Sequence, residues 1–393
     1  MVTWSIPRSV LLLSFGTFIV GTDAHSVAGL LPEMASSLQT SVAGAGQSVT
    51  VFAIAYAVLA PIWGVVMARH GQRRTLVSGL VLFVLGNALT AVAGSMPVLL
   101  AGRVVAAAGA AMFTPAAGAM AVRLAGPERR GTALAWVTTG VAGALVLGAP
   151  VGAAIASAAS WRVTLAVIAV LGLAMLPGVL LLPPVPPAPA QRFADQLPVL
   201  RSPQILTTLG ISVIAFVGVF IPYTYLSQSY APLVAALPGG ISTVLLLFGL
   251  TSVIGVLASG PLTDRVSSRW MVVVVTAALA VVDAVAVLGR ESPLVLVAAL
   301  LAAGYLSWSI LTPQQHQLVA AEPDHAAVLI SFNAAAGYVG ISLAGVLGGT
   351  AITVLGSARF TLVASAFLLV AACWRAVPVP RADRAEPEVV RRG

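Results

Sequence analysis

Charge is scarce in this chain. Only 8% of its 393 residues are Asp, Glu, Lys or Arg, and lysine is absent altogether. A soluble domain carries about 25% charged residues, so a chain this poor in charge cannot cover a water-facing surface. The hydrophobic share of 59% agrees with this conclusion. These proportions exclude a soluble enzyme, a disordered chain and a fibrous protein.

Cysteine is nearly absent as well, since Cys373 is the single one. One cysteine cannot form an internal disulfide bond or a cysteine-based metal cluster. The four histidines are scattered, and the sequence has no His-Glu-x-x-His and no Gly-x-Ser-x-Gly motif. We therefore expect no cofactor, no bound metal and no enzymatic activity, and a membrane-embedded enzyme is only a remote alternative.

Long apolar runs take the place of charge. A membrane-crossing helix needs about 20 mostly apolar residues. Twelve such runs lie near residues 10–31, 45–66, 75–95, 98–121, 132–156, 162–183, 204–229, 241–262, 270–289, 293–313, 326–349 and 358–376. The sequence thus predicts an all-α membrane protein with twelve transmembrane helices.

The placement of arginine predicts the orientation. Sixteen of the twenty arginines fall in the two tails and in every second loop, whereas the other loops hold only Arg162, Arg290 and Arg359. Because basic residues collect on the cytoplasmic side, we expect both termini to be cytoplasmic and the protein to lie in the cell (inner) membrane. The net charge of +8, spread in short clusters between apolar runs, fits membrane orientation better than nucleic-acid binding.

A proline-rich segment at 184–203 divides the chain. Proline removes helix donors, so we interpret this segment as a cytoplasmic linker. It separates an N-terminal six-helix bundle (1–183) from a C-terminal six-helix bundle (204–376). Residues 377–393 are polar and broken by prolines, which predicts a disordered cytoplasmic tail.

The two predicted bundles contain a repeat. Three pairs of residues in the loops after the second and eighth spans are each separated by 196 positions: Gly64 and Gly260, Arg69 and Arg265, Arg73 and Arg269. A glycine permits close helix approach, and the arginines can reach acidic groups, helix C-termini or lipid phosphates. We interpret the two copies as conformational latches that hold the halves together, formed by Gly64, Arg69, Gly71, Arg73, Gly260, Asp264, Arg265 and Arg269. The alternative is that these arginines only set the membrane topology.

Several segments resemble the major facilitator superfamily, in particular its twelve-span drug:proton antiporters and their sugar and drug efflux branch. They are the segment from Gly64 to Arg74, which is similar to the signature G-x-L-x-D-R-x-G-R-R with Ala68 at the Asp position; Gly16–Asp23; Leu147–Gly152; and Asn333–Tyr338. The resemblance implies two pseudo-symmetric bundles that alternate in access to a central site. It also implies that Gly148, Pro150 and Gly152 form a kink that seals the cavity of an antiporter.

Ionisable groups within the spans are functional candidates, because charges in hydrocarbon are unfavourable unless paired or hydrated. At 1.5 Å per residue, Asp23 in the first span and Arg103 in the fourth lie at similar depths. We therefore expect them to meet and to couple transport to protons. Beside Arg103 the carboxylate stays ionised, and away from it the carboxyl group takes up a proton. A static charge pair that fixes helix register is the alternative.

Two other groups within the spans are harder to place. His25 is expected to form a hydrogen bond to a neighbouring helix rather than to carry protons. Asp283 in the ninth span is expected to form a local hydrogen bond, with a second proton site as the alternative.

The substrate contacts rest on polar-tipped side chains in spans seven, ten and eleven: Tyr225, Asn333, Tyr223, Gln228 and Trp308. Tyrosine and tryptophan near span ends also serve as interface anchors. With so little charge in the membrane, the expected cargo is a small neutral or lipophilic-cationic organic molecule. We predict a monomeric, proton-coupled efflux transporter whose partners are this substrate, protons and membrane lipids. Sugar or nucleoside efflux by the same fold is the alternative.

Overall fold

The computed structural model describes residues 8–67, 70–125, 130–184, 197–322 and 326–377. Within these ranges the regular structure is helical, without a strand. Eleven helical stretches there are long and apolar enough to cross a membrane, and Thr361–Ala376 forms a shorter apolar helix. The predicted all-α membrane fold is therefore confirmed.

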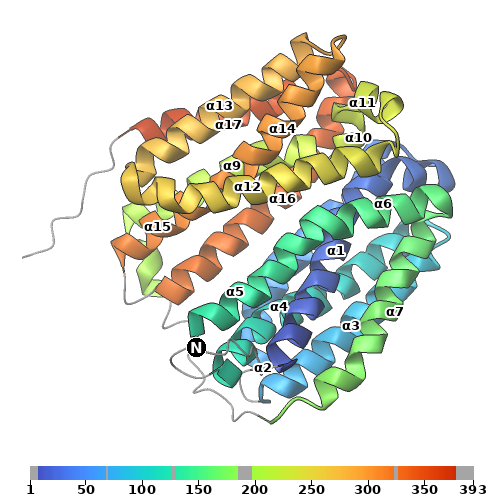
Figure 1. Ribbon diagram of the computed structural model, residues 1–393, viewed down its shortest axis with the longest axis vertical. Coiled ribbons are helices and arrows are strands. Elements are labelled where there is room, and N and C mark those ends of the chain that lie inside the picture. Colours follow the sequence, from blue (N-terminus) through green and yellow to red (C-terminus); the bar gives the residue numbers. More distant parts are fainter. Residues whose placement is uncertain (1–7, 68–69, 126–129, 185–196, 323–325, 378–393) are drawn as a thin grey trace, which may run out of the picture.

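The helices form two groups, which Figure 1 shows side by side in blue to green and in yellow to red. The first group consists of α1 (Arg8–Ser37), α2 (Val42–Met67), α3 (Gln72–Ala91), α4 (Met96–Ala125), α5 (Arg130–Gly143), the π-helical turn η2 (Ala144–Gly148), α6 (Ala149–Ala158) and α7 (Trp161–Leu180). After a 3-10 turn, η3 (Leu197–Arg201), the second group consists of α9 (Pro203–Thr224), α10 (Leu226–Ser229), α11 (Ala231–Ala236), α12 (Ile241–Arg265), α13 (Ser268–Leu288), α14 (Pro293–Ser309), α15 (Leu311–Ala321), α16 (Ala326–Leu355) and α17 (Thr361–Ala376).

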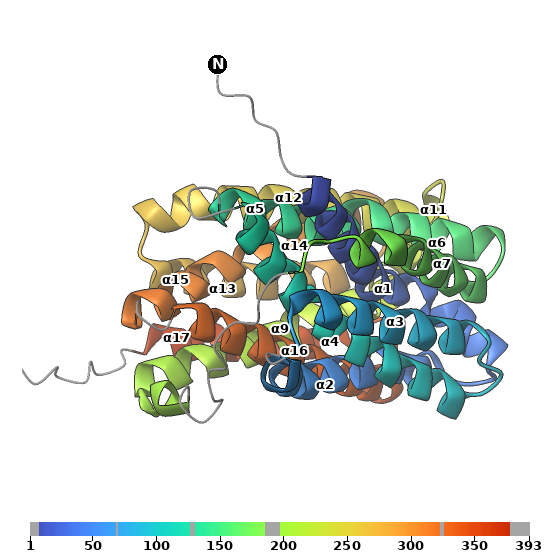
Figure 2. The ribbon, with the colours of Figure 1, turned by 90° about the horizontal axis from the view of Figure 1, so that it is seen from below.

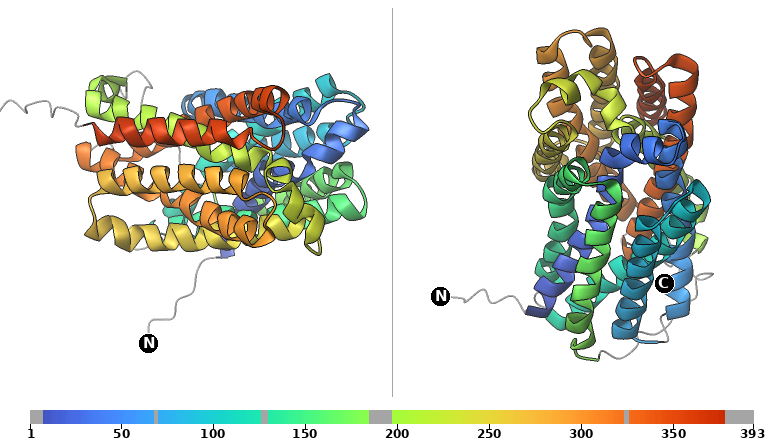
Figure 3. Two further views of the ribbon diagram at one scale, coloured as in Figure 1. Left: turned by 90° about the horizontal axis from the view of Figure 1, so that it is seen from above. Right: turned by 90° about the vertical axis from the view of Figure 1, so that its right-hand side faces the viewer.

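The long helices of both groups run side by side along one direction, as Figures 2 and 3 show. Most of the predicted linker (185–196) and nearly all of the predicted tail (378–393) lie outside the described residues.

Two of the predicted continuous spans are broken helices. The seventh, predicted over 204–229, ends as α9 at Thr224, and the non-helical residues Tyr225 and Tyr230 separate it from α10 and α11. The tenth, predicted over 293–313, consists of α14 and α15, which meet at Ile310 and continue to Ala321. Hydropathy measures the length of an apolar run but not the backbone angles within it, so the sequence could not locate these breaks.

Helices α3 and α4 pack with their backbones in contact. Gly86 of α3 faces the backbone of Ala106, and Gly109 of α4 faces the backbone of Phe83. Lipid offers no hydrophobic force between helices, so small residues that allow such close approach supply the attraction. This packing fixes the position of α4 and of Arg103, which lies one turn before Ala106.

The two groups contact each other along α2 and α16 and along α12 with η2 and α6. The tight contacts lie at the end of the bundle where α1 ends. A Cβ atom added at Gly345 of α16 would lie 2.0 Å from the Thr50 hydroxyl of α2, and one at Gly249 of α12 would lie 2.6 Å from the Leu145 carbonyl oxygen. The structure is therefore closed between the halves at this end, which is the outer side in the predicted orientation.

The α3–α4 packing yields a first prediction. In Gly86→Ala the new Cβ atom would lie 2.1 Å from the Ala106 amide nitrogen, so the backbones must separate. We expect this overpacking to destabilise the protein by about 1–3 kcal/mol, measured as a lower thermal unfolding midpoint in detergent. Gly94→Ala is the matched control, because nothing lies within 4 Å of its added Cβ atom. Equal midpoints for the two variants would contradict this account of the packing.

Candidate functional site

A buried ion pair joins α1 to α4. Nη1 of Arg103 donates a hydrogen bond of 2.6 Å to Oδ1 of Asp23, and both side chains are at most 1% exposed. The Arg103 guanidinium also lies 4.3 Å from the centre of the Phe52 ring on α2. Sequence depth alone placed Asp23 and Arg103 at the same level, and the structure brings them into direct contact.

The pair is not fully satisfied. Oδ2 of Asp23 and Nε of Arg103 are both buried without a hydrogen-bond partner among the described residues. A buried ion pair is stable only when attraction and additional hydrogen bonds compensate for lost hydration. The free oxygen and the free N–H group make this pair less firmly held than a fully bonded one.

A cavity of about 220 Å³ lies between the halves, and Arg103 forms part of its wall. Three of the predicted substrate residues line it: Tyr223 of α9, Trp308 of α14 and Asn333 of α16. Ser212 donates a hydrogen bond of 2.6 Å to Oδ1 of Asn333, whereas the Asn333 Nδ2 group has no partner among the described residues. An apolar wall with a few polar groups is typical of a small-molecule site.

Two other predicted substrate residues lie elsewhere. The fully buried Tyr225 donates a hydrogen bond of 2.7 Å to the Gly345 carbonyl oxygen, and its ring faces Gly46 of α2. Tyr225 therefore closes the bundle between the halves instead of lining the cavity. Gln228 does not line the cavity either, and its backbone carbonyl oxygen accepts a hydrogen bond from Arg290. Sequence patterns could not separate these roles, because a polar-tipped ring suits a cavity, a seal or an interface equally well.

His25 lines the cavity and lies between the halves. Its Nδ1 atom donates to the Gly21 carbonyl oxygen at 2.8 Å, within its own helix, so the expected bond to a neighbouring helix is wrong. Its ring lies 6.1 Å from that of Tyr223 and 5.9 Å from that of Trp308. Because Nδ1 carries the hydrogen, Nε2 of the neutral ring is a hydrogen-bond acceptor.

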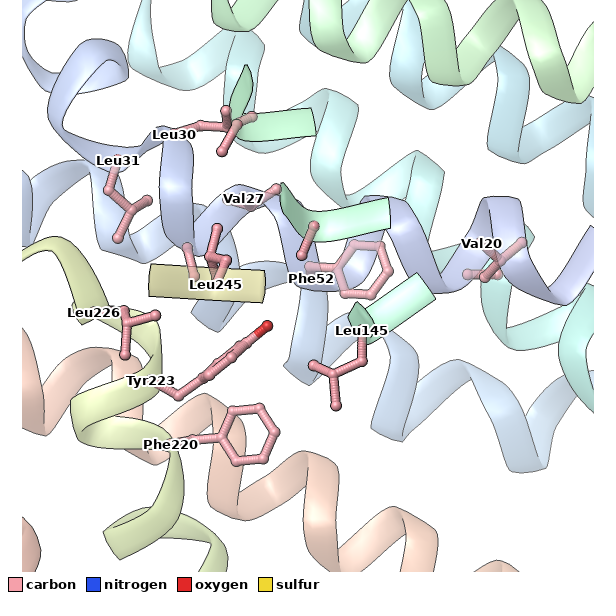
Figure 4. Packing of buried hydrophobic residues seen from close by; sticks show 14 of the residues in the cluster. Val20, Val27, Leu30, Leu31, Phe52, Leu145, Phe220, Tyr223, Leu226 and Leu245 are labelled. Atoms are coloured by element: carbon pink, nitrogen blue, oxygen red, sulfur yellow. The ribbon is translucent and has the colours of Figure 1, made fainter. Parts of the chain in front are cut away.

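The Tyr223 hydroxyl reaches across the halves. It donates to the His25 carbonyl oxygen at 3.3 Å. Figure 4 shows the ring standing between the ribbon of α9 and that of α1, with its oxygen turned away from α9. The contact lies at the closed end of the bundle and must break when the halves separate there.

Several aromatic residues that line the cavity were not predicted as site residues: Phe52, Phe216, Phe220 and Tyr338. A signal existed for two of them, since Phe216, Phe220 and Tyr223 are spaced so that they share one face of a helix. For Phe52 and Tyr338 the sequence did not show which face of the helix points to the cavity.

The repeated arginines bind within their own halves. Nη1 of Arg73, at the start of α3, donates to the Leu182 carbonyl oxygen just after α7, at 3.2 Å. Arg269, at the start of α13, donates to the carbonyl oxygens of Arg375 and Ala376 at the end of α17. Each arginine thus binds the free carbonyl groups after the last helix of its half, so these two do not hold the halves together as expected.

Other predicted latch residues are less informative. Gly71 precedes α3 with a φ of 79°, a conformation that glycine adopts readily. Arg265 is exposed. Arg69 lies outside the described residues, as do the side-chain surroundings of Gly64, Gly260 and Asp264.

The predicted kink coincides with η2, which directly precedes Pro150 in α6. Proline has no N–H group to donate, and a π-helical turn is one way in which a helix adapts. Gly148 and Gly152 face Thr22 and Ser26 of α1, and an added Cβ atom would lie 2.1 Å from the Thr22 hydroxyl oxygen or 2.8 Å from the Ser26 Cβ atom. This face of η2 and α6 therefore packs tightly on Thr22, which directly precedes Asp23, and on Ser26, which follows it by three positions.

Comparison with known proteins agrees with this architecture. The family model described as Major Facilitator Superfamily matches residues 13–345. The chain is 30% identical over 339 residues to the uncharacterized MFS-type transporter YbcL of Bacillus subtilis (strain 168), covering 84% of each chain. It is 32% identical over 315 residues to a chloramphenicol resistance protein of Streptomyces lividans, covering 78% of this chain and 79% of the relative.

A solved structure shares the fold. The crystal structure of the nucleoside transporter NupG superposes with a TM-score of 0.79 at 14% identity, covering 94% of this chain and 99% of that one. With its helical stretches and cavity, the chain is a multi-pass membrane protein that acts on a small molecule, and it is a transporter rather than an enzyme. It belongs to the Major Facilitator Superfamily.

Proposed function

We propose that this chain is a proton-coupled exporter of a small neutral or lipophilic-cationic organic molecule in the cell (inner) membrane. The observation that carries this proposal is the buried pair of Asp23 and Arg103, of which Arg103 lines the central cavity. Charges in hydrocarbon are unfavourable. A passive pore would not require an ion pair at this place, whereas a proton-coupled transporter would.

The pair supplies a mechanism for coupling. In the closed arrangement the two charges compensate each other at 2.6 Å. Both residues belong to the first half, so the pair opens when the Arg103 side chain turns away from Asp23 within that half as the cavity opens. The carboxylate is then left among apolar groups and takes up a proton from water. Protonation then allows the conformation without the pair, so that proton entry drives exit of the cargo. The protein acts in this scheme as a monomer with two rocking bundles.

The cavity supports the proposed cargo. Its walls include the aromatic rings of Phe52, Phe220 and Trp308, and its polar groups are few. The Arg103 charge is already paired, so the site offers no free cation for a polyanion. The relative from Streptomyces lividans is a chloramphenicol resistance protein, which favours a drug-like cargo for this chain.

Sugar or nucleoside export is the second candidate. The amide groups of Gln315 and Asn333 lie in the cavity wall, and the Asn333 Nδ2 group is without a partner among the described residues. Such groups suit hydroxyl-rich cargo. A panel of chloramphenicol, ethidium, arabinose and uridine distinguishes the two candidates. Cells that express the protein should export one class and should lose that export when a protonophore is added.

The central prediction concerns Asp23→Asn. The amide cannot exchange a proton, so export driven by a pH gradient should be abolished while the protein still folds. The measurement is export of the identified cargo from cells or proteoliposomes with an imposed pH gradient. Glu33→Gln is the matched control near the end of the same helix, because the Glu33 carboxylate accepts hydrogen bonds from the backbone amide of Trp161 at the start of α7. Full export by Asp23→Asn would overturn the coupling role.

The ion pair also yields a prediction of stability. Arg103→Met leaves the buried Asp23 carboxylate without a cation, which should destabilise the protein by about 3–5 kcal/mol. The double variant Asp23→Asn with Arg103→Met removes both charges and should recover much of that loss. Thermal unfolding in detergent at neutral pH measures both. If the double variant unfolds at a lower temperature than Arg103→Met, the two residues do not stabilise each other.

A further inference from the structure

A second carboxyl group is buried in the membrane region, and the coupling scheme above does not use it. Asp283 lies on α13 and is 3% exposed. Its Oδ2 atom has no hydrogen-bond partner, and no arginine or histidine among the described residues forms an ion pair with it. The expected local hydrogen bond is therefore missing from this oxygen. A buried polar group without a partner indicates an unseen partner, such as a proton or water.

Asp283 borders a small cavity of about 10 Å³. This volume is about the smallest that can hold one water molecule. The hydroxyl-bearing residues around it are Tyr223 of α9, Tyr230 after α10 and Ser307 of α14. The pocket thus offers a carboxyl group, room for one water molecule and hydroxyl groups that could hold that water.

The pocket lies beside the break in span seven. Pro222, Leu226 and Tyr230 line it, and the non-helical residues Tyr225 and Tyr230 bound α10. At membrane depth, irregular backbone is tolerated where it lines a cavity or is buried in protein, and broken helices are common features of ion and proton sites in transporters. The break is a second feature, independent of Asp283, that marks this place.

The charges around Asp283 are few. In the pocket the titratable neighbours are Tyr223 and Tyr230, while α12 and α14 contribute Phe248, Ala303 and Ser307. Arg290, two turns further along from Asp283, donates to the backbone carbonyl oxygens of Gln228 and Ser229 at the far end of α10. On α15 and α17, which pack against α13, His316 and Arg375 lie at the opposite end of α13. There His316 shares a hydrogen bond with the Ser268 hydroxyl, and the Arg375 carbonyl oxygen accepts one from Arg269.

Tyr223 separates this pocket from the central cavity, because it lines both. Its hydroxyl is held by the His25 carbonyl oxygen across the halves. Rocking of the halves at the closed end must break that bond and free the ring. The pocket of Asp283 then communicates with the central cavity in one conformation and is closed off in the other.

We propose that Asp283 is a second proton-binding site, which exchanges a proton with water of the central cavity past Tyr223. The carboxylate takes the proton from water in the conformation that frees Tyr223 and returns it to water after the opposite movement. The role in transport rests on the proposed function, since a second site adds one proton to each transport cycle. For a neutral cargo, this adds one positive charge to each exchange.

The sequence repeat provides a natural comparison. Subtracting the repeat distance of 196 from position 283 gives Asn87 on α3, a fully buried amide in the first half. Its Nδ2 group donates to the Phe83 carbonyl oxygen at 3.1 Å. The equivalent place in the other half thus accommodates an amide, so Asp283→Asn is expected to fold.

Infrared spectroscopy of the purified protein in lipid nanodiscs, titrated over pH, tests the site without any cargo. We expect the carbonyl stretching band of a protonated carboxylic acid to lose one component in Asp283→Asn and to regain it in Asp283→Glu. A spectrum of Asp283→Asn that equals that of the wild type at every pH would overturn the proposal. This result does not depend on the proposed function, because no transport is measured.

Proteoliposomes test the role in transport, with chloramphenicol as the probe. The number of protons exchanged per molecule, obtained from the membrane potential at which flux reverses, should fall by one in Asp283→Asn. Asp283→Leu keeps neither the proton nor a hydrogen bond. If the group were only structural, Asp283→Asn would behave as the wild type and Asp283→Leu would fail, which would overturn the proposal.

A flux that requires sodium and loses this requirement in Asp283→Asn would also overturn the proposal. If Asp23→Asn retains its coupling while the infrared component of Asp283 is present, the proposed function fails and the site stands.

Discussion

The contact between Asp23 and Arg103 is the interaction on which the rest of this structure depends. Two charges at 2.6 Å, almost fully buried, persist only because each holds the other in a region that excludes water. The helices around them are placed with little freedom. Glycines allow α4 to pack closely on α3. Gly148 and Gly152 allow η2 and α6 to pack closely on the face of α1 next to Asp23. The small residues in these helices therefore set the distance between the charges as well as the packing.

Close packing at small residues also forms the closed end of the bundle. Glycines of α16 and α12 allow contact with α2 and η2, and the Tyr225 ring packs against Gly46 of α2. Contacts through small residues bury little side-chain surface, so they hold the halves together without making the closed state permanent. Within each half, by contrast, Arg73 and Arg269 bind the carbonyl groups after the last helix. These bonds stiffen the bundles, while the contacts between the bundles remain exchangeable, as rocking requires.

The sequence predicted the features that depend on position along the chain. Apolar runs located the spans, and the rise per residue placed Asp23 and Arg103 at one depth. The sequence did not predict the features that depend on the rotation of a helix about its axis or on backbone angles. Tyr225 and Tyr223 stand two positions apart, yet one seals the halves and the other lines the cavity. Prolines and polar residues lie near the breaks at Tyr225 and Ile310, but membrane helices tolerate both, so these residues did not locate the breaks.

The repeat distinguishes the residues that stabilise each half from the ionisable residues within the membrane region. Positions 196 residues apart share the arginines that bind the last helix of each half, but the ionisable groups of the membrane region do not follow the repeat. Val219 and Ala299 stand where the repeat places the counterparts of Asp23 and Arg103, and Asn87 stands at the counterpart of Asp283. Among the residues whose burial the structure describes, each half thus contributes one buried carboxyl group, Asp23 on α1 and Asp283 on α13. The second half folds with alkyl groups at both counterparts of the pair, so the Asp23 carboxylate is required by the buried Arg103 rather than by the scaffold. We attribute the burial of both carboxyl groups to the protons that we propose they carry.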